Sequence, residues 1–279
     1  MRRVLAEVAS VTLGVALVIW SLTPVYDMLL IALDRDEGDI EFESIIWPPD
    51  PSLHSFYTVL TQGYWLLENF WRQFGNSFFI GVMTMFLTVL IGSLAGFALS
   101  RLRLGTGWLL NAPLLTYAVP ASFLVIPFSR LMAAYGLSNS LWAIVAANVT
   151  FASPYAILIL RQYARLIPIE LDEAARVDGA SPAQVYRRVY LPLMTPALAA
   201  VGTFALLLAW NEYLYQYVLL SSTRNMTVAV AIAQFFNSDE APWNYMMATA
   251  LIYSLPPIVI FYALRRYLAA GLTRGALKG

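Results

Sequence analysis

The sequence contains no cysteine, one histidine and one lysine. Without cysteine the chain has no disulfide, no thiolate metal ligand and no cysteine nucleophile. The histidine, His54, lies in a polar loop, where we expect a solvent-exposed side chain rather than a metal ligand. The lysine, Lys278, is not part of a GxxxxGK[ST] phosphate-binding loop, so the chain lacks that type of nucleotide site. We therefore expect no catalytic residue, no metal site and no cofactor bound by this chain.

Charged residues are also scarce, at 12 % of 279 residues, whereas an ordinary globular chain has roughly 25 %. Six intervals of 19 to 30 uncharged residues interrupt the sequence. Each can hold the ~20 residues of a membrane-spanning helix, whereas core helices of a water-soluble protein would carry charge at every turn. We predict an all-α membrane protein forming a single transmembrane domain over residues 1–279. The six predicted spans are about 8–32, 75–99, 107–129, 140–160, 193–217 and 246–264. The first is too long for the apolar region of a signal peptide, so we expect it to be retained.

Net charge is zero, but the basic residues are unevenly distributed. If the N-terminus lies inside, 13 of the 17 basic residues fall in inner segments, and the outer ones hold only Arg35, Arg72, Arg130 and Arg224. Because basic loops resist translocation, this bias predicts that both termini face the cytoplasm. The acidic stretch "DRDEGDIEFE" then lies outside, in loop 33–72, and the tail 265–279 lies inside.

The inner loop 161–192 contains "ELDEAARVDGASPAQVYRRVYLP", a charged passage with two helix signals. Gly179 can take the left-handed conformation that ends a helix, which predicts a first helix over about 169–178. A second helix is predicted to start at Pro182, because Ser181 and Gln184 have the spacing of a capping box. The passage is thus a helix–turn–helix rather than a slack linker.

Within the first predicted helix, Glu170, Asp172 and Glu173 cluster at the N-terminal end, where carboxylates are favoured. Asp172 and Arg176 have the i, i+4 spacing that allows an ion pair. Leu171, Ala174, Ala175 and Asp178 share one face, and most of these side chains are small. Another surface could therefore approach the helix closely.

The same passage carries a known motif. Glu173-Ala174-Ala175, then Gly179 after three residues, then Val189 and Leu191-Pro192, resembles the signature of bacterial ABC-importer permeases. "FGNSFFIG" (74–81), "AGFALSRLRL" (95–104), "AWNEYL" (209–214) and "GLTRGALKG" (271–279) resemble the maltose-type sugar permeases. The resemblance covers about residues 70–279 and matches the first 70 only weakly.

This resemblance implies the type I permease fold of ABC importers and a place in the bacterial cytoplasmic membrane. It implies a permease subunit that moves a sugar, a di- or oligosaccharide, received from an external sugar-binding protein. The other partners implied are a second homologous permease, forming a heterodimer, and two ATPase subunits that hold ATP and Mg²⁺; no nucleic acid is involved. The residues implied to couple to the ATPase are Glu173, Ala174, Ala175, Asp178, Gly179 and Pro192, with Gly275 and Lys278 in an ATPase-contacting tail.

Sugar contacts need hydroxyl-binding groups and aromatic faces. In the fifth span we expect Asn211 and Tyr215 to line the substrate pathway, with Asn148 of the fourth span opposite, and we expect Glu212 to be structural. The alternative function is a secondary transporter or channel that uses intramembrane carboxylates, for which Asp27 and Glu212 are the candidates.

Overall fold

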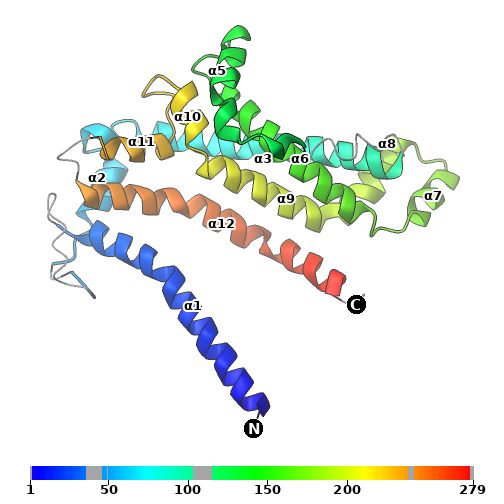
Figure 1. Cartoon of the computed structure of the whole chain (residues 1–279), viewed down its shortest axis with the longest axis horizontal. Coiled ribbons are helices and arrows are strands. Elements are labelled where there is room, and N and C mark those ends of the chain that lie inside the picture. Colours follow the sequence, from blue (N-terminus) through cyan, green and yellow to red (C-terminus); the bar gives the residue numbers. More distant parts are fainter. Residues whose placement is uncertain (1, 36–45, 49, 103–114, 238–241, 277–279) are drawn as a thin grey trace. The chain divides into compact units, whose positions relative to one another are not determined.

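The computed structural model describes residues 2–35, 46–48, 50–102, 115–237 and 242–276, and for 2–5, 117 and 268–276 it describes the backbone alone. The described residues form helices and no strand (Figure 1). They divide into two compact units: Met1–Trp71 with Ala231–Leu255, and Arg72–Val230 with Pro256–Gly279. Each unit is described below by itself.

Among the described residues, five helical stretches are long and apolar enough to cross a membrane. They contain α1 (Arg2–Leu33), α3 (Phe70–Arg101), α6 (Leu141–Ala164), α9 (Leu191–Asn211) and α12 (Trp243–Ala276). These helices overlap all the expected spans except the third, 107–129.

The third expected span lies partly outside the described residues. From residue 115 onward the chain forms short turns, η2 (Thr116–Ala118) and η3 (Ala121–Leu124), and then α5 (Val125–Ala134). The apolar helix described here, Ala121–Ala134, is shorter than the five long ones.

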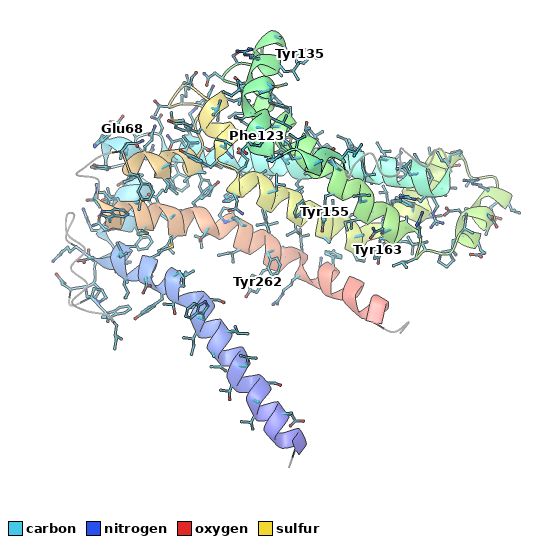
Figure 2. All side chains as sticks on the ribbon, viewed as in Figure 1. Glu68, Phe123, Tyr135, Tyr155, Tyr163 and Tyr262 are labelled. Carbon is cyan, nitrogen blue, oxygen red and sulfur yellow. The ribbon has the colours of Figure 1, made fainter. Side chains whose placement is uncertain are left out.

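Many large apolar side chains of these helices point outward. Figure 2 draws the side chains of described residues, and exposed ones among those it labels are Tyr262 of α12, Phe123 of η3 and Tyr135, which follows α5. In water, each exposed large apolar side chain forgoes about 1.5–3 kcal/mol of burial free energy, a penalty that a lipid environment removes. The exposure therefore fits helices that face hydrocarbon.

In the second unit, α3 and α6 run parallel in close contact. The rings of Phe79 and Trp142 have centroids 5.2 Å apart. Further along, a Cβ added to Gly92 would lie 2.9 Å from the Cβ of Ala156. The partners are 63 residues apart in the first contact and 64 in the second, so the two helices keep one register. Only glycine permits the close approach at position 92.

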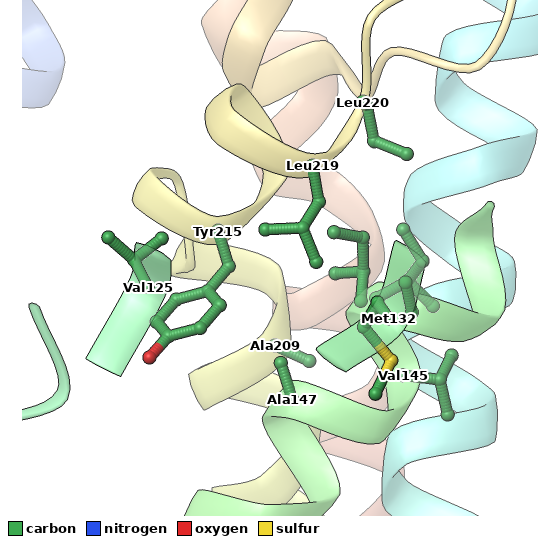
Figure 3. Close-up of a cluster of buried hydrophobic side chains, with 11 residues drawn as sticks. Val125, Met132, Val145, Ala147, Ala209, Tyr215, Leu219 and Leu220 are labelled. Atoms are coloured by element: carbon green, nitrogen blue, oxygen red, sulfur yellow. The ribbon is translucent and has the colours of Figure 1, made fainter. Parts of the chain in front are cut away.

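A buried apolar cluster joins α5, α6 and α9 to the short helix α10 (Leu214–Leu219). Figure 3 shows Val125 and Met132 from α5, with Val145 and Ala147 from α6. The other members are Ile80, Ala143, Ile144, Ala209, Tyr215, Leu219 and Leu220. The cluster fixes the end of α9 against α6, which is where the predicted sugar-contacting residues fall.

In the first unit, α2 (His54–Thr61) and η1 (Trp65–Leu67) follow the segment after α1. The ring of Tyr64 contacts Phe235, at the end of α11 (Val228–Phe235), and Tyr245 of α12. His54 is exposed at the start of α2. The described part of the chain contains no group of metal-ligating residues.

Candidate functional site

The first helix of the charged passage is α7 (Glu170–Val177), close to the predicted range. It ends because Gly179 has φ +82°. The N–H of Gly179 donates to the carbonyl of Arg176 (3.0 Å), and the N–H of Ala180 donates to that of Ala175 (2.9 Å). These two bonds form a Schellman motif, which satisfies the last carbonyls of the helix. The predicted role of Gly179 as a helix stop is confirmed.

The second helix starts with the predicted capping box. The Ser181 N–H donates to Oε1 of Gln184 (2.7 Å), and the Gln184 N–H donates to Oγ of Ser181 (3.4 Å). Pro182 occupies the first position of α8 (Pro182–Val185). Because these bonds fix both sides of the turn, the backbone between α7 and α8 is set by local sequence.

A π-turn, η4 (Tyr186–Tyr190), connects α8 to α9. The N–H of Leu191 donates to the carbonyl of Tyr186, five residues earlier. Pro192 follows in the first turn of α9 and has no N–H to donate to Arg188. A proline ring also collides with the carbonyl four residues before it, and the wider turn relieves that collision. Pro192 thus lies at the junction of the passage with a long helix.

The motif residues are largely solvent-accessible. Glu173, Ala174, Asp178 and Gly179 are exposed, and Ala175 is half-buried. Next to them are exposed apolar side chains, of which Val177 is 88 % accessible. We call the exposed residues Leu171, Glu173, Ala174, Val177 and Asp178 the α7 face. On this face the exposed apolar side chains of Leu171 and Val177 lie beside acidic ones. Exposed apolar groups rimmed by polar residues are a feature of interaction sites.

The predicted local ion pair between Asp172 and Arg176 is wrong, because Asp172 pairs with Arg101 instead. Arg176 is exposed, whereas Asp172 is buried and its Oδ2 lies 3.2 Å from Nε of Arg101, at the end of α3. The spacing along α7 allowed the local pair, but the helix turns Asp172 inward and Arg176 outward. Local sequence patterns could not predict the contact between Arg101 and Asp172, because the two residues are 71 positions apart.

The three predicted pathway residues lie in different environments. Tyr215 is 3 % exposed, and its hydroxyl donates to the carbonyl of Ala121 (2.7 Å). Asn211 is exposed, and its Nδ2 donates to the carbonyl of Leu207 (2.9 Å). Asn148 is 1 % exposed, and neither its Nδ2 nor its Oδ1 has a hydrogen-bond partner among the described residues.

Glu212 lies at a break between α9 and α10. Its Oε1 accepts the N–H of Tyr215 (2.7 Å), and its Oε2 accepts the N–H of Gln216 (3.2 Å). The carboxylate therefore caps α10 by filling backbone donors that have no partner within the helix. This geometry agrees with the structural role expected for Glu212.

Gln216 also stabilises this break between α9 and α10. The sequence patterns above do not single it out. It is 1 % exposed, its Nε2 donates to the carbonyl of Ala209 (3.3 Å), and its Oε1 accepts the hydroxyl of Thr227. The signal that could have identified it is a glutamine within an apolar segment, because a buried amide side chain needs hydrogen-bond partners.

No side chain is described for the two residues predicted to form an ATPase-contacting tail. Gly275 belongs to the last part of α12, where only the backbone is described, and Lys278 lies outside the described residues.

Comparison with known proteins identifies relatives along the whole chain. The trehalose transport system permease protein SugB of Mycobacterium tuberculosis is 36 % identical over 207 residues, which are 73 % of this chain and 76 % of that protein. The diacetylchitobiose uptake system permease protein DasC of Streptomyces coelicolor is 30 % identical over 278 residues, 99 % of this chain and 98 % of that protein.

A solved structure gives the fold. The crystal structure of a bacterial ABC transporter involved in the import of the acidic polysaccharide alginate contains a chain that matches with a TM-score of 0.78. The match covers 95 % of this chain and 96 % of that one at 22 % identity. Residues 58–274 match the family described as "Binding-protein-dependent transport system inner membrane component". This chain therefore has the fold of an ABC-importer permease and belongs to the family of binding-protein-dependent transport system inner membrane components.

Proposed function

We propose that this chain is the permease subunit of an ATP-driven importer that carries a di- or oligosaccharide through the inner membrane. The observation that carries the proposal is α7, which exposes Glu173 and Ala174 of the Glu173-Ala174-Ala175 motif and ends at Gly179 with φ +82°. Support for the substrate class comes from the two relatives named for trehalose and diacetylchitobiose, which are both disaccharides.

In this proposal ATP is hydrolysed by separate polypeptides. The chain has no GxxxxGK[ST] segment, so ATP and Mg²⁺ are bound by two ATPase subunits. A second homologous permease completes the pathway, and an external binding protein delivers the sugar. The α7 face is the surface that meets an ATPase subunit, because it is exposed and mixes apolar with acidic side chains. Gly275 and Lys278, in the tail, make an additional ATPase contact.

The orientation follows from charge. With both termini inside, the α7 face lies in the cytoplasm, on the side where an ATPase has access to ATP. The 13-to-4 division of the 17 basic residues between inner and outer segments supports this arrangement.

The substrate pathway in this proposal uses Asn148, Asn211 and Tyr215. Asn148 offers a buried donor and acceptor without a partner among the described residues, so separation of the helices would allow it to bind a sugar hydroxyl. Tyr215 would have to release the carbonyl of Ala121 to do the same. The alternative is a secondary transporter that uses Asp27 and Glu212. For Glu212 a structural role is favoured over it, because both of its oxygens accept backbone N–H groups, whereas Asp27 is exposed on α1.

Transport in proteoliposomes tests the function. The chain is reconstituted with its partner permease, ATPase and binding protein, and uptake of labelled trehalose, diacetylchitobiose and a monosaccharide control is measured with and without ATP. We expect ATP-dependent uptake of at least one of the two disaccharides. ATP-independent uptake driven by an ion gradient would support the alternative.

A variant of the α7 face tests the coupling. Glu173→Lys reverses a charge on this face near the helix N-terminus and should abolish copurification of the ATPase, while membrane insertion stays normal. Glu7→Lys, in α1, is the matched charge-reversal control. Normal copurification with Glu173→Lys would contradict the role of α7.

A further inference from the structure

Arg101, the last residue of α3, contacts two other elements through one buried guanidinium. Its Nη2 donates to the carbonyls of Ala164 (3.0 Å) and Ile167 (2.9 Å), at and just beyond the end of α6. Its Nε lies 3.2 Å from Oδ2 of Asp172, in α7. The latter contact is an ion pair by distance, although its angles are not those of a hydrogen bond.

The guanidinium suits this position because it is planar and presents its donors in fixed directions. Besides the guanidinium, the carbonyl of Ala164 accepts the N–H of Ile167 in a turn-type bond (3.2 Å). A cation at a helix C-terminus is favoured. Once Nη2 is bound to Ala164 and Ile167, the orientation of the guanidinium is set. Its Nε edge then faces Asp172, and α7 is held at a defined place relative to α3 and α6.

Asp172 is the one buried residue among the eight of α7. The side chains of Arg101 and Asp172 are 4 % and 3 % exposed, whereas those of the other described ion pair, Arg35–Asp50, are 67 % and 71 % exposed. An exposed pair contributes little, but loss of one partner from a buried pair leaves an uncompensated charge. Ala175, half-buried on α7, also packs against the apolar cluster that contains Leu160 and Ala164. The Arg101–Asp172 pair is therefore the polar part of the attachment of α7, and the part whose loss leaves a buried charge unpaired.

We propose that Arg101 and Asp172 are positioning residues that tie α7 to the ends of α3 and α6, so that a displacement of α7 moves these two helices with it. The inference rests on the proposed function for the statement that an ATPase subunit displaces α7. The attachment itself is independent of that function. It assigns to a transmembrane helix end, outside the Glu173–Pro192 motif, a part in coupling.

Spin-label distances test the attachment without any transport assay. The chain has no cysteine, so Gln162→Cys on α6 and Val177→Cys on α7, both exposed, give two unique labelling sites in the full chain in liposomes. We expect a narrow distance distribution in the parent and a broad one in Arg101→Met and Asp172→Asn. Arg176→Met, an exposed arginine of α7, is the control and should stay narrow. A narrow distribution in Arg101→Met would overturn the proposal.

The coupling ratio, sugar transported per ATP hydrolysed in the reconstituted importer, tests the consequence. A purely structural defect lowers both rates together and leaves the ratio unchanged. We expect Arg101→Met and Asp172→Leu each to lower the ratio by about tenfold or more, because either leaves one buried charge unpaired and α7 loose.

The double variant Arg101→Met/Asp172→Leu separates folding from positioning. It buries no unpaired charge, so expression and thermal stability should recover. The ratio should stay low, because methionine cannot donate to the carbonyls of Ala164 and Ile167. A wild-type ratio in the double variant would overturn the proposal. Normal ATPase binding by Glu173→Lys would instead contradict the proposed function of α7, and the label distances would still decide the attachment.

Discussion

Gly179 combines a left-handed backbone with empty surroundings. Its φ is +82°, and nothing in the described structure lies within 4 Å of the place a Cβ would occupy. A non-glycine residue in this conformation costs roughly 1–2 kcal/mol, although asparagine visits it more readily. The space around the glycine leaves room for a partner to approach the backbone.

Two substitutions at Gly179 separate conformation from contact. Gly179→Leu should lower the thermal unfolding temperature in detergent and abolish ATPase copurification. Gly179→Asn should unfold at nearly the wild-type temperature but still weaken copurification, since its side chain enters the space for the partner. Full copurification of Gly179→Asn would mean that only the backbone conformation matters.

Glu212 should contribute stability rather than transport chemistry. Glu212→Ala removes the acceptor of two backbone N–H groups, and loss of such a cap costs about 1 kcal/mol. We expect a lower unfolding temperature and less assembled complex, with a milder effect from Glu212→Gln, which keeps one acceptor oxygen. Asn211→Ala is the neighbouring comparison and should reduce sugar-stimulated transport at normal expression. The reverse pattern would exchange the two roles.

At the scale of elements, the contact between α3 and α6 depends on the absence of a side chain at residue 92. Gly92→Ala should destabilise the protein by about 1–3 kcal/mol, because its Cβ would overlap that of Ala156. Gly75→Ala, on the same helix but with no atom within 4 Å of the added Cβ, is the control and should be neutral or stabilising. Thermal unfolding in detergent measures both. Ala156→Gly should restore part of the stability of Gly92→Ala, because it removes the nearest atom while Cδ1 of Leu160 remains 3.1 Å from the added Cβ. No recovery at all would contradict the overlap with Ala156.

Elements fixed by local rules were predictable from the sequence. The bounds of α7, the stop at Gly179 and the capping box of Ser181 and Gln184 depend on residues a few positions apart. The partner of Asp172 was not predictable, because Arg176 satisfied the local spacing and Arg101 is distant in sequence. The break after Asn211 was also missed, since neither glycine nor proline marks it and its stabilising bonds come from Glu212 and Gln216.

For the whole molecule, the predicted orientation places the termini and α7 on one side of the membrane. The absence of cysteine makes single-cysteine labelling unambiguous. Leu53→Cys, exposed after the first long helix, should react with an impermeant thiol reagent added outside intact cells, and Val177→Cys should react only after the membrane is opened. The reverse labelling would overturn the topology and, with it, the place of the ATPase.

The sequence predicted the membrane class and the long helices well, because a run of apolar residues is sufficient to specify a spanning helix. It predicted the candidate substrate residues less directly. Asn148 and Tyr215 were chosen for their chemistry, and their burial depends on how α6, α9 and α10 pack together. Packing of this kind arises from contacts among distant segments, which no single stretch encodes.

The π-turn before α9 changes the meaning of a spacing in the motif. Along this segment the buried side chains are Val185, Tyr190, Met194, Ala197 and Val201. Their intervals are three or four residues except the first, which is five, as a turn with one surplus residue requires. A helical wheel drawn straight through the segment would therefore misplace every residue before the turn by about 100°. The number of residues between Gly179 and Pro192 thus includes one whose effect is to set the rotation of the preceding helix about the helix axis. Deleting it would rotate the whole of α7 about the axis of α9, with every motif residue still present in the chain.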